Sequence, residues 1–237
     1  MILRDQEDFS FPILLFEKIE SWMTMNYVFE ILPSLFSGAG MTLEIFFETL
    51  IFSLPLGVIL SFGLNSRFKP LKWFLNVYVW LMRGTPLLLQ LIFVFYGLPI
   101  IGLTFPRYMA AIVAFVLNYT AYFAEIFRGG NQAIDKGQIE AAKVLQLTYG
   151  QTLRKIVIPQ VIKIVLPSIG NEVINLVKDS SLVYVIGLGD LLRAGNLATS
   201  RDVTLVPLVL VALIYLLLIG LCTVILRKLE KHYSYYR

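Results

Sequence analysis

Residues 128–160 read RGGNQAIDKGQIEAAKVLQLTYGQTLRKIVIPQ, a polar and charged stretch that lies between two long apolar runs. Connections between secondary-structure elements are commonly short, whereas this one is long enough to form a small helix-turn-helix of its own. Ala141 and Ala142 are strong helix formers with little bulk, so a helix that carries them can pack closely into a groove. Glu140 near the start of that helix favours its positive end. We therefore expect residues 129–156 to form a structured elbow that a separate subunit can grip.

The composition is that of a membrane protein. Of the 237 residues, 57% are hydrophobic and only 15% are charged, and the mean hydropathy is +0.75. Soluble domains carry about 25% charged residues, and a spanning helix needs ~20 mainly apolar residues. The fold class expected is an all-α integral membrane protein with one membrane domain over 41–228 and a cytoplasmic tail over 229–237. The five expected spans are 41–64, 73–101, 108–127, 157–177 and 203–226.

The first 40 residues are expected to form an extracytoplasmic segment. Residues 11–36 mix aromatic and charged side chains, which is too polar to span and suits an interfacial helix lying in the headgroups. The alternative is a poorly ordered leader. We expect no cleavable signal peptide, because the residues from Met1 to Asp8 are acidic and lack an apolar core.

The distribution of lysine and arginine predicts the orientation in the membrane, because basic loops stay in the cytoplasm. The connection after the second span carries only Arg107, and the connection after the fourth balances two arginines with two aspartates. The other segments are strongly basic: Arg67, Lys69 and Lys72; Arg128, Lys136, Lys143, Arg154, Lys155 and Lys163; Arg227, Lys228, Lys231 and Arg237. This pattern predicts a multi-pass protein of the bacterial cytoplasmic membrane with its N-terminus outside and its C-terminus inside. The net charge of +4 therefore indicates topology and not nucleic-acid binding.

The second expected span is interrupted by Arg83-Gly84-Thr85-Pro86. Proline removes a backbone hydrogen bond and clashes with the preceding turn, so a kink is expected here. Broken helices are tolerated in a membrane where they line a cavity, and a buried guanidinium must find partners. We expect these four residues to form a helix kink or gate; the alternative is a tilted helix with a tolerated proline.

The chain lacks the residues that catalysis or nucleotide binding would need. The dipeptide Gly-Lys of a phosphate-binding loop is absent, so any energy from ATP has to come from a partner. With Cys222 and His232 as the only cysteine and histidine, no internal disulfide or tetrahedral metal site can form, and no nucleophile–base pair is present. No internal repeat is apparent, whereas secondary transporters contain paired halves. A second subunit is therefore expected to complete the pore.

Three motifs give the chain a resemblance to a known family. They are RGTPLLLQ at 83–90, NYTAYFAE at 118–125 with Arg128-Gly129-Gly130, and EAAKVL at 140–145 followed by Ile158-Pro159-Gln160. Together, over about 41–228, they resemble the permease subunit of bacterial ABC importers of polar amino acids, the type that takes up glutamine, histidine, arginine or cystine. One departure from the family pattern is Gln146, which stands where the family has glycine after the EAAxxL stretch, and this puts the turn geometry there in question.

The resemblance implies the type I importer fold, with five transmembrane helices and a cytoplasmic coupling helix, and transport by alternating access. It also implies four kinds of partner: a second permease, identical or paralogous; two ATP-binding subunits that carry ATP and magnesium; an extracytoplasmic amino-acid-binding protein; and the lipid bilayer. The coupling residues would be Glu140, Ala141, Ala142, Lys143 and Leu145, which would dock on the ATPase. The alternative for them is a solvated amphipathic loop helix.

Polar residues inside the spans are the substrate candidates, because an ionisable side chain in a membrane must be paired or face water. Asn118, Tyr122 and Glu125 share one helical face. Asn171, Asn175 and Lys178 recur likewise on the fourth span, followed by Asp179, Ser180 and Ser181. We expect the two faces, with Gln90, to line the translocation route, and Glu125 or Asp179 to hold a substrate ammonium. The alternatives are that Glu125 pairs with Arg128 and that Lys178 pairs with Asp179.

Two other functional classes compete with this interpretation. A stand-alone secondary transporter or channel would need no ATP, but the absent repeat and the structured elbow argue against it. A membrane enzyme would need a catalytic constellation, and none is visible. The sequence leaves open which amino acid is carried, whether the two permeases are identical, and in what form the binding protein occurs.

Overall fold

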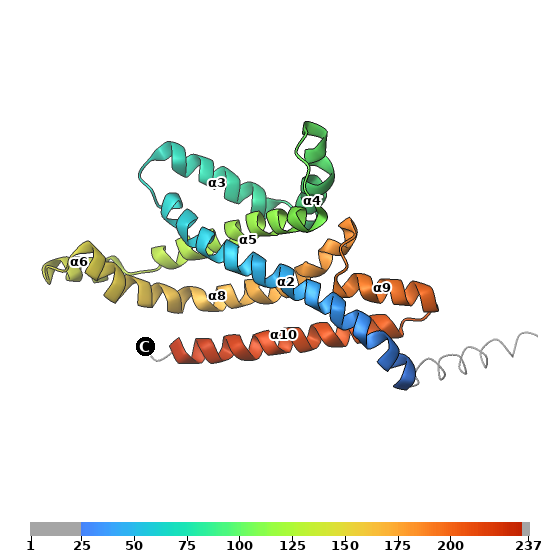
Figure 1. Cartoon of the computed structure of the whole chain (residues 1–237). Helices are drawn as coiled ribbons and strands as arrows, with labels where there is room; N and C mark the ends of the chain where they lie inside the picture. The colour runs from blue at the N-terminus through green and yellow to red at the C-terminus, as the bar shows by residue number, and fades with distance from the viewer. Residues whose placement is uncertain (1–24, 234–237) are drawn as a thin grey trace, which may run out of the picture.

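The computed structural model describes residues 25–233, and over this range every regular element is a helix (Figure 1). Two of the short elements, η1 (Phe93–Gly97) and η3 (Leu153–Val157), are π-helices, and two, η2 (Leu98–Ile101) and η4 (Ser180–Ile186), are 3₁₀-helices. The elements in chain order are α2 (Met25–Leu64), α3 (Lys69–Gly84), α4 (Leu87–Ile92), η1 (Phe93–Gly97), η2 (Leu98–Ile101), α5 (Arg107–Gln132), α6 (Lys136–Val144), α7 (Tyr149–Thr152), η3 (Leu153–Val157), α8 (Ile158–Asp179), η4 (Ser180–Ile186), α9 (Leu191–Asp202) and α10 (Val206–Tyr233).

Four helical segments of the described chain are long and apolar enough to cross a membrane: Asn26–Leu64, Arg107–Gln132, Tyr149–Ile186 and Val206–Tyr233. A fifth segment passes the same test only as a bent pair, in which Lys69–Gly84 and Leu87–Ile101 meet at 105°. The predicted interruption of the second span between Arg83 and Pro86 is therefore confirmed, and the bend is much sharper than a simple kink.

The segment before the first predicted span differs from expectation. Residues 11–24 lie outside the described residues, but residues 25–36 are the first turns of α2 and do not form a separate interfacial helix. At ~1.5 Å per residue a helix of 40 residues is about 60 Å long, twice the hydrocarbon thickness. Its first part is covered by α9 and α10, where Ile31 and Leu35 are buried with Leu191 and Val211. This tertiary contact explains why residues 25–36, although partly polar, are helical and continuous with the rest of α2.

Helix α5 occupies the centre of the bundle and packs against α2, α3 and α8. Its large aromatic residues Phe115, Tyr119 and Phe123 are fully or almost fully buried. The α2 helix approaches α5 closely at Gly57, where an added Cβ would lie 2.5 Å from the Cβ of Phe123. In contrast, α10 leaves most of its leucines exposed, as a helix that faces lipid does.

The chain reverses direction between the long helices, so that the basic segments lie together at one end of the molecule. Figure 1 shows the α2–α3 connection, α6 and the end of α10 at one end of the molecule, with α4 and α9 at the other. The first end therefore collects the basic segments of the sequence, as far as residue 233. This arrangement is the one that the charge pattern predicts for a single side of the membrane.

Candidate functional site

A polar cavity of about 530 Å³ lies where the broken helix α3–α4 meets α5 and α8. Its lining residues include one guanidinium, two carboxylates, two amides and two phenols. Ligand pockets in proteins commonly measure about 300–1,000 Å³, so the cavity has room for a small molecule. The lining residues are Arg83, Gly84, Thr85, Pro86, Leu87, Leu88, Asn118, Tyr119, Tyr122, Glu172, Asn175, Asp179 and Leu182.

The break between α3 and α4 is fixed by Pro86 and by the side-chain amides of Gln90 and Asn118. Thr85 is extended, as a residue before proline must be, and α4 starts after Pro86. The break leaves the carbonyl of Met82 without its helical partner, and it accepts hydrogen bonds from Gln90 Nε2 at 2.9 Å and Asn118 Nδ2 at 3.0 Å. Gln90 Oε1 also accepts from Asn118 Nδ2 at 3.0 Å. The two amides therefore fasten the bent helix to α5.

This network separates two of the predicted substrate residues. Asn118 lines the polar cavity, but Gln90 lines a different, largely apolar cavity in the angle of the bend. Gln90 Nε2 also donates to the hydroxyl of Thr85 at 2.8 Å. Gln90 therefore lies outside the lining of the polar cavity, and its hydrogen bonds stabilise the break between α3 and α4.

Arg83 enters the cavity from the last turn of α3. Its guanidinium lies 5.3 Å from the ring centroid of Tyr122, within the range of a cation–π contact, and 3.9 Å from a carboxylate oxygen of Glu125. These contacts hold the guanidinium at the rim while leaving its side chain 42% exposed. A cation in this position can receive an anionic group of a ligand.

Glu125 does not line the cavity. Its carboxylate accepts hydrogen bonds from Nε of Arg128 at 2.7 Å and from the Nη2 atom of the same guanidinium. Of the two interpretations of Glu125 given above, the structure therefore bears out the pair with Arg128. Arg128 also donates to Gln132 at 2.8 Å, which continues the pairing along α5.

The opposite wall is one face of α8. Glu172, Asn175 and Asp179 recur at spacings of three and four residues and point into the cavity together. The hydroxyl of Tyr119 donates to Asp179 at 2.8 Å and fixes its carboxylate. The sequence reasoning missed Glu172, although the same periodicity that singled out Asn171 would have found it one residue further on.

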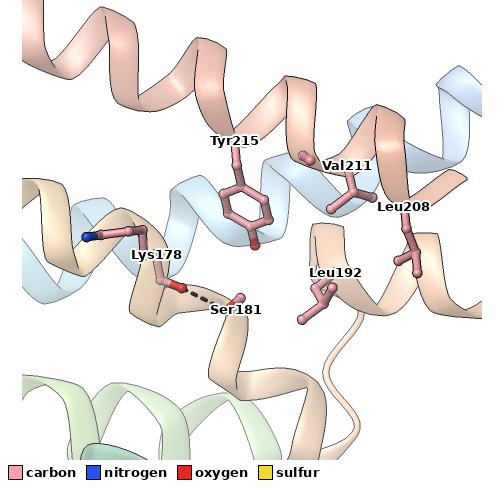
Figure 2. A pocket seen from close by; sticks show the side chains of 7 residues that line it. Lys178, Ser181, Leu192, Leu208, Val211 and Tyr215 are labelled. Atoms are coloured by element: carbon pink, nitrogen blue, oxygen red, sulfur yellow. Dashed lines mark hydrogen bonds between the residues drawn. The ribbon is translucent and has the colours of Figure 1, made fainter.

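The neighbouring polar residues of α8 face elsewhere. Lys178 lines a second cavity of about 380 Å³ between α8, α9 and α10, and the other side chains around it are mainly apolar (Figure 2). Ser181 lies there too and donates to the carbonyl of Lys178 at 2.7 Å. Ser180 is completely buried, donates to Val177, and does not line the polar cavity. Of the polar residues predicted on this part of the chain, Asn175 and Asp179 therefore line the polar cavity, whereas Asn171, Lys178, Ser180 and Ser181 do not.

The predicted elbow contains a short helix, α6, whose residues differ in exposure. Asp135 caps its start by accepting from the backbone N–H of Gly137 at 2.6 Å. Within the coupling set, Ala142 is buried, whereas Glu140, Ala141, Lys143 and Leu145 are exposed. The large side chains of Val144, Leu145 and Tyr149 are 82%, 71% and 80% exposed, and together they give the elbow an apolar tip.

The turn after α6 answers the question raised by Gln146. The N–H of Leu147 donates to the carbonyl of Ala142, and the N–H of Gln146 donates to that of Lys143. This is the Schellman motif, which requires a left-handed residue at the position of Gln146. Gln146 accordingly has φ +55°, a conformation that favours glycine. The usual turn geometry is thus preserved, with glutamine in place of glycine.

Comparisons with known proteins agree on one family. The family model described as binding-protein-dependent transport system inner membrane component matches residues 53–234. The chain is 41% identical over 202 residues to the arginine transport system permease protein ArtQ of Bacillus subtilis, covering 84% of this chain and 92% of the relative. It is 34% identical over 211 residues to the putative glutamine transport system permease protein GlnP of Rickettsia conorii, covering 87% and 97%.

Solved structures extend this likeness to the fold. The crystal structure of an amino acid ABC transporter with histidines matches with a TM-score of 0.82 and 34% identity, over 89% of this chain and 99% of the other. An inward-facing structure of the MetNI methionine ABC transporter matches with a TM-score of 0.70 over 86% and 98%, and its 20% identity supports the fold alone. The chain therefore belongs to the family of binding-protein-dependent transport system inner membrane components.

Proposed function

We propose that this chain is the permease subunit of an ATP-driven amino-acid importer, and that the polar cavity between α3–α4, α5 and α8 holds the amino acid during transport. The observation that carries the proposal is the set of charges in the cavity. An amino acid brings a carboxylate and an ammonium group, and the cavity offers Arg83 for the first and Asp179 or Glu172 for the second. Relatives named for arginine and glutamine transport support the same class of substrate.

The balance of charge favours one kind of amino acid. Two carboxylates and one guanidinium leave the cavity with an excess of one negative charge when all three are ionised. A neutral amino acid would leave one carboxylate without a cationic partner, whereas a cationic side chain such as that of arginine supplies one. Asn118, Asn175 and Tyr122 complete the lining as neutral hydrogen-bonding groups. The proposed substrates are therefore cationic amino acids.

The elbow fits the role of a coupling element. The exposed apolar tip formed by Val144, Leu145 and Tyr149 projects at the end of the molecule that carries the basic segments. Exposed apolar groups of this kind mark contact surfaces. In the proposed arrangement the bent pair counts as one of five spans, the N-terminus lies outside, and each of two ATPases docks on the elbow of one permease. A second permease completes the pore, and an external binding protein delivers the substrate.

The test compares two variants at the cavity with one outside it. Glu172→Gln keeps the shape of the side chain and removes the excess charge. Arginine uptake by the reconstituted transporter should therefore fall about 10- to 150-fold, the range for a lost charged hydrogen bond of about 1.5–3 kcal/mol. Glutamine uptake should fall much less. Asp179→Asn is expected to reduce uptake of both amino acids, because it removes a candidate acceptor for the ammonium group that they share.

Glu230→Gln is the matched control, because Glu230 lies near the end of α10, away from the lining. Unchanged uptake in both cavity variants, with the complex assembled as in the control, would remove the cavity from the transport route. A direct check of the partners is co-expression with candidate ATPase subunits. A stable complex whose ATP hydrolysis rises with binding protein and substrate is expected.

A further inference from the structure

A second polar cavity lies at the other end of α8, outside the proposed transport route. It has a volume of about 610 Å³ and is formed where the elbow returns to the bundle through the π-helix η3. Its wall combines Gln138 of α6 with the last residues of η3 and the first two turns of α8. The lining residues are Gln138, Lys155, Ile156, Pro159, Gln160, Lys163 and Ile164.

The charges of this cavity have one sign. Lys155 and Lys163 supply two ammonium groups, and none of the residues that line it in the described part of the chain is acidic. Gln160 turns its amide back to donate to the carbonyl of Ile156 at 2.9 Å. Asp135, which caps α6 on the neighbouring elbow, does not line the cavity. The electrostatic character of the cavity therefore complements an anion.

The remaining lining is apolar and faces outward. Ile156 and Pro159 lie between the two lysines in the sequence, and Ile164, in the direction of the membrane span, is 43% exposed. A small hydrated anion has no use for such a surface, whereas an amphiphile with an anionic head and a hydrocarbon tail fits both parts. The position supports this match, since the cavity lies at the start of the span Tyr149–Ile186, where basic side chains meet the headgroup layer.

The ATPase is expected elsewhere on the same elbow. The apolar tip at Val144, Leu145 and Tyr149 shares no residue with the lining of the cavity, most of which belongs to the first turns of α8. Along the chain, the part of the lining on η3 and α8 lies between the tip and the rest of the span Tyr149–Ile186. We propose that it binds the headgroup of an anionic phospholipid of the inner leaflet, with the phosphate held by Lys155 and Lys163 and an acyl chain along Ile164. Basic pockets between membrane helices on the cytoplasmic side are known to take such headgroups. The choice of leaflet rests on the orientation in the proposed function.

The experiment counts lipids retained by the whole transporter, purified as full-length chain with its co-expressed subunits. Phosphatidylglycerol is titrated against a phosphatidylcholine background, and native mass spectrometry measures the retained molecules. Each lysine near an anionic surface contributes about 1 kcal/mol, or roughly fivefold in affinity. The double variant Lys155→Gln with Lys163→Gln should therefore bind phosphatidylglycerol about 25-fold more weakly, and Lys155→Arg with Lys163→Arg should restore most of the affinity.

The control is Lys69→Gln with Lys72→Gln, which removes the same charge at the same end of the molecule but outside the cavity. It should change the affinity by less than about twofold. Equal loss in the control pair, or no loss in the cavity pair, overturns the site. Displacement of phosphatidylglycerol by millimolar inorganic phosphate would show a soluble-phosphate site and overturn the lipid assignment. Because retention is measured without transport, the two proposals can fail separately. If the cavity lysines prove not to bind phosphatidylglycerol while arginine uptake depends on Glu172 and Asp179 as predicted, this inference alone is rejected; if the lipid binds as predicted while uptake is unchanged in the Glu172 and Asp179 variants, the proposed function alone is rejected.

Discussion

Replacement of Gln146 by glycine is expected to stabilise the elbow. Gln146 is the left-handed residue of the Schellman motif that ends α6, with φ +55°. A left-handed conformation brings the Cβ of an L-residue close to the next carbonyl oxygen, at a cost of about 1–2 kcal/mol. The side chain is exposed, so its removal loses little contact. Gln146→Gly therefore relieves strain without opening a cavity.

The gain is reduced by the greater freedom of glycine in the unfolded elbow, which costs about 0.5–1 kcal/mol. The net stabilisation should be about 0.5–1 kcal/mol, and the equilibrium for opening the turn should fall about two- to fivefold. The effect should be local, because the two hydrogen bonds concerned join Leu147 to Ala142 and Gln146 to Lys143.

Hydrogen–deuterium exchange of the amides around Leu147 measures this local opening, after correction for the intrinsic rates of the altered sequence. In the glycine variant these amides should exchange about two- to fivefold more slowly than in the wild type. Gln146→Ala is the matched control, since it removes the same polar group but keeps the Cβ, and it should show no protection. If the glycine variant exchanges at the wild-type rate, or if alanine protects equally, the strain assigned to this turn is not real.

Three further predictions concern other parts of the fold. Val203 ends α9 at φ +52° with an exposed, branched side chain, so Val203→Gly should raise the midpoint of thermal unfolding in detergent, and a lowered midpoint would refute the argument. Gly57→Ala should destabilise by about 1–3 kcal/mol because its Cβ would lie 2.5 Å from that of Phe123, whereas Gly40→Ala, with open space around it, should be tolerated in the same unfolding assay. Burial raises the pKa of Asp190 to about 6, so the folded protein binds a proton more tightly than the unfolded chain does. The free energy of unfolding should then decrease as the pH rises from about 4 to about 6. Asp190→Asn, which can still cap α9, should lose this dependence.

The features that the sequence predicts well are those set by local chemistry. The break in the second span follows from Pro86, and the short helix of the elbow follows from its alanines, its cap and the polar residues around it. Three of the expected spans lie within the long helical segments, and a fourth, 203–226, begins three residues before α10, because hydropathy alone selects these stretches. The pairing of Glu125 with Arg128 was available from their spacing of three residues on one helix.

The features that were missed depend on contacts between distant segments. The first turns of α2 remain helical because α9 and α10 cover Ile31 and Leu35, and no local pattern reports this. The position of Gln90 depends on a carbonyl freed eight residues earlier and on an amide from α5. Glu172 was overlooked because a shift of one residue turns a helical face by ~100°, and only the packing of α8 selects which face meets α5.

The central claim is that this chain is a passive gate, driven by ATP hydrolysis in a separate subunit. The most direct test is uptake of radiolabelled arginine into sealed proteoliposomes with the complete transporter, or with this chain alone, in the presence of binding protein. Accumulation above the external concentration is predicted only for the complete transporter and only with hydrolysable ATP. Accumulation by this chain alone, or by the complete transporter without ATP, would contradict the account.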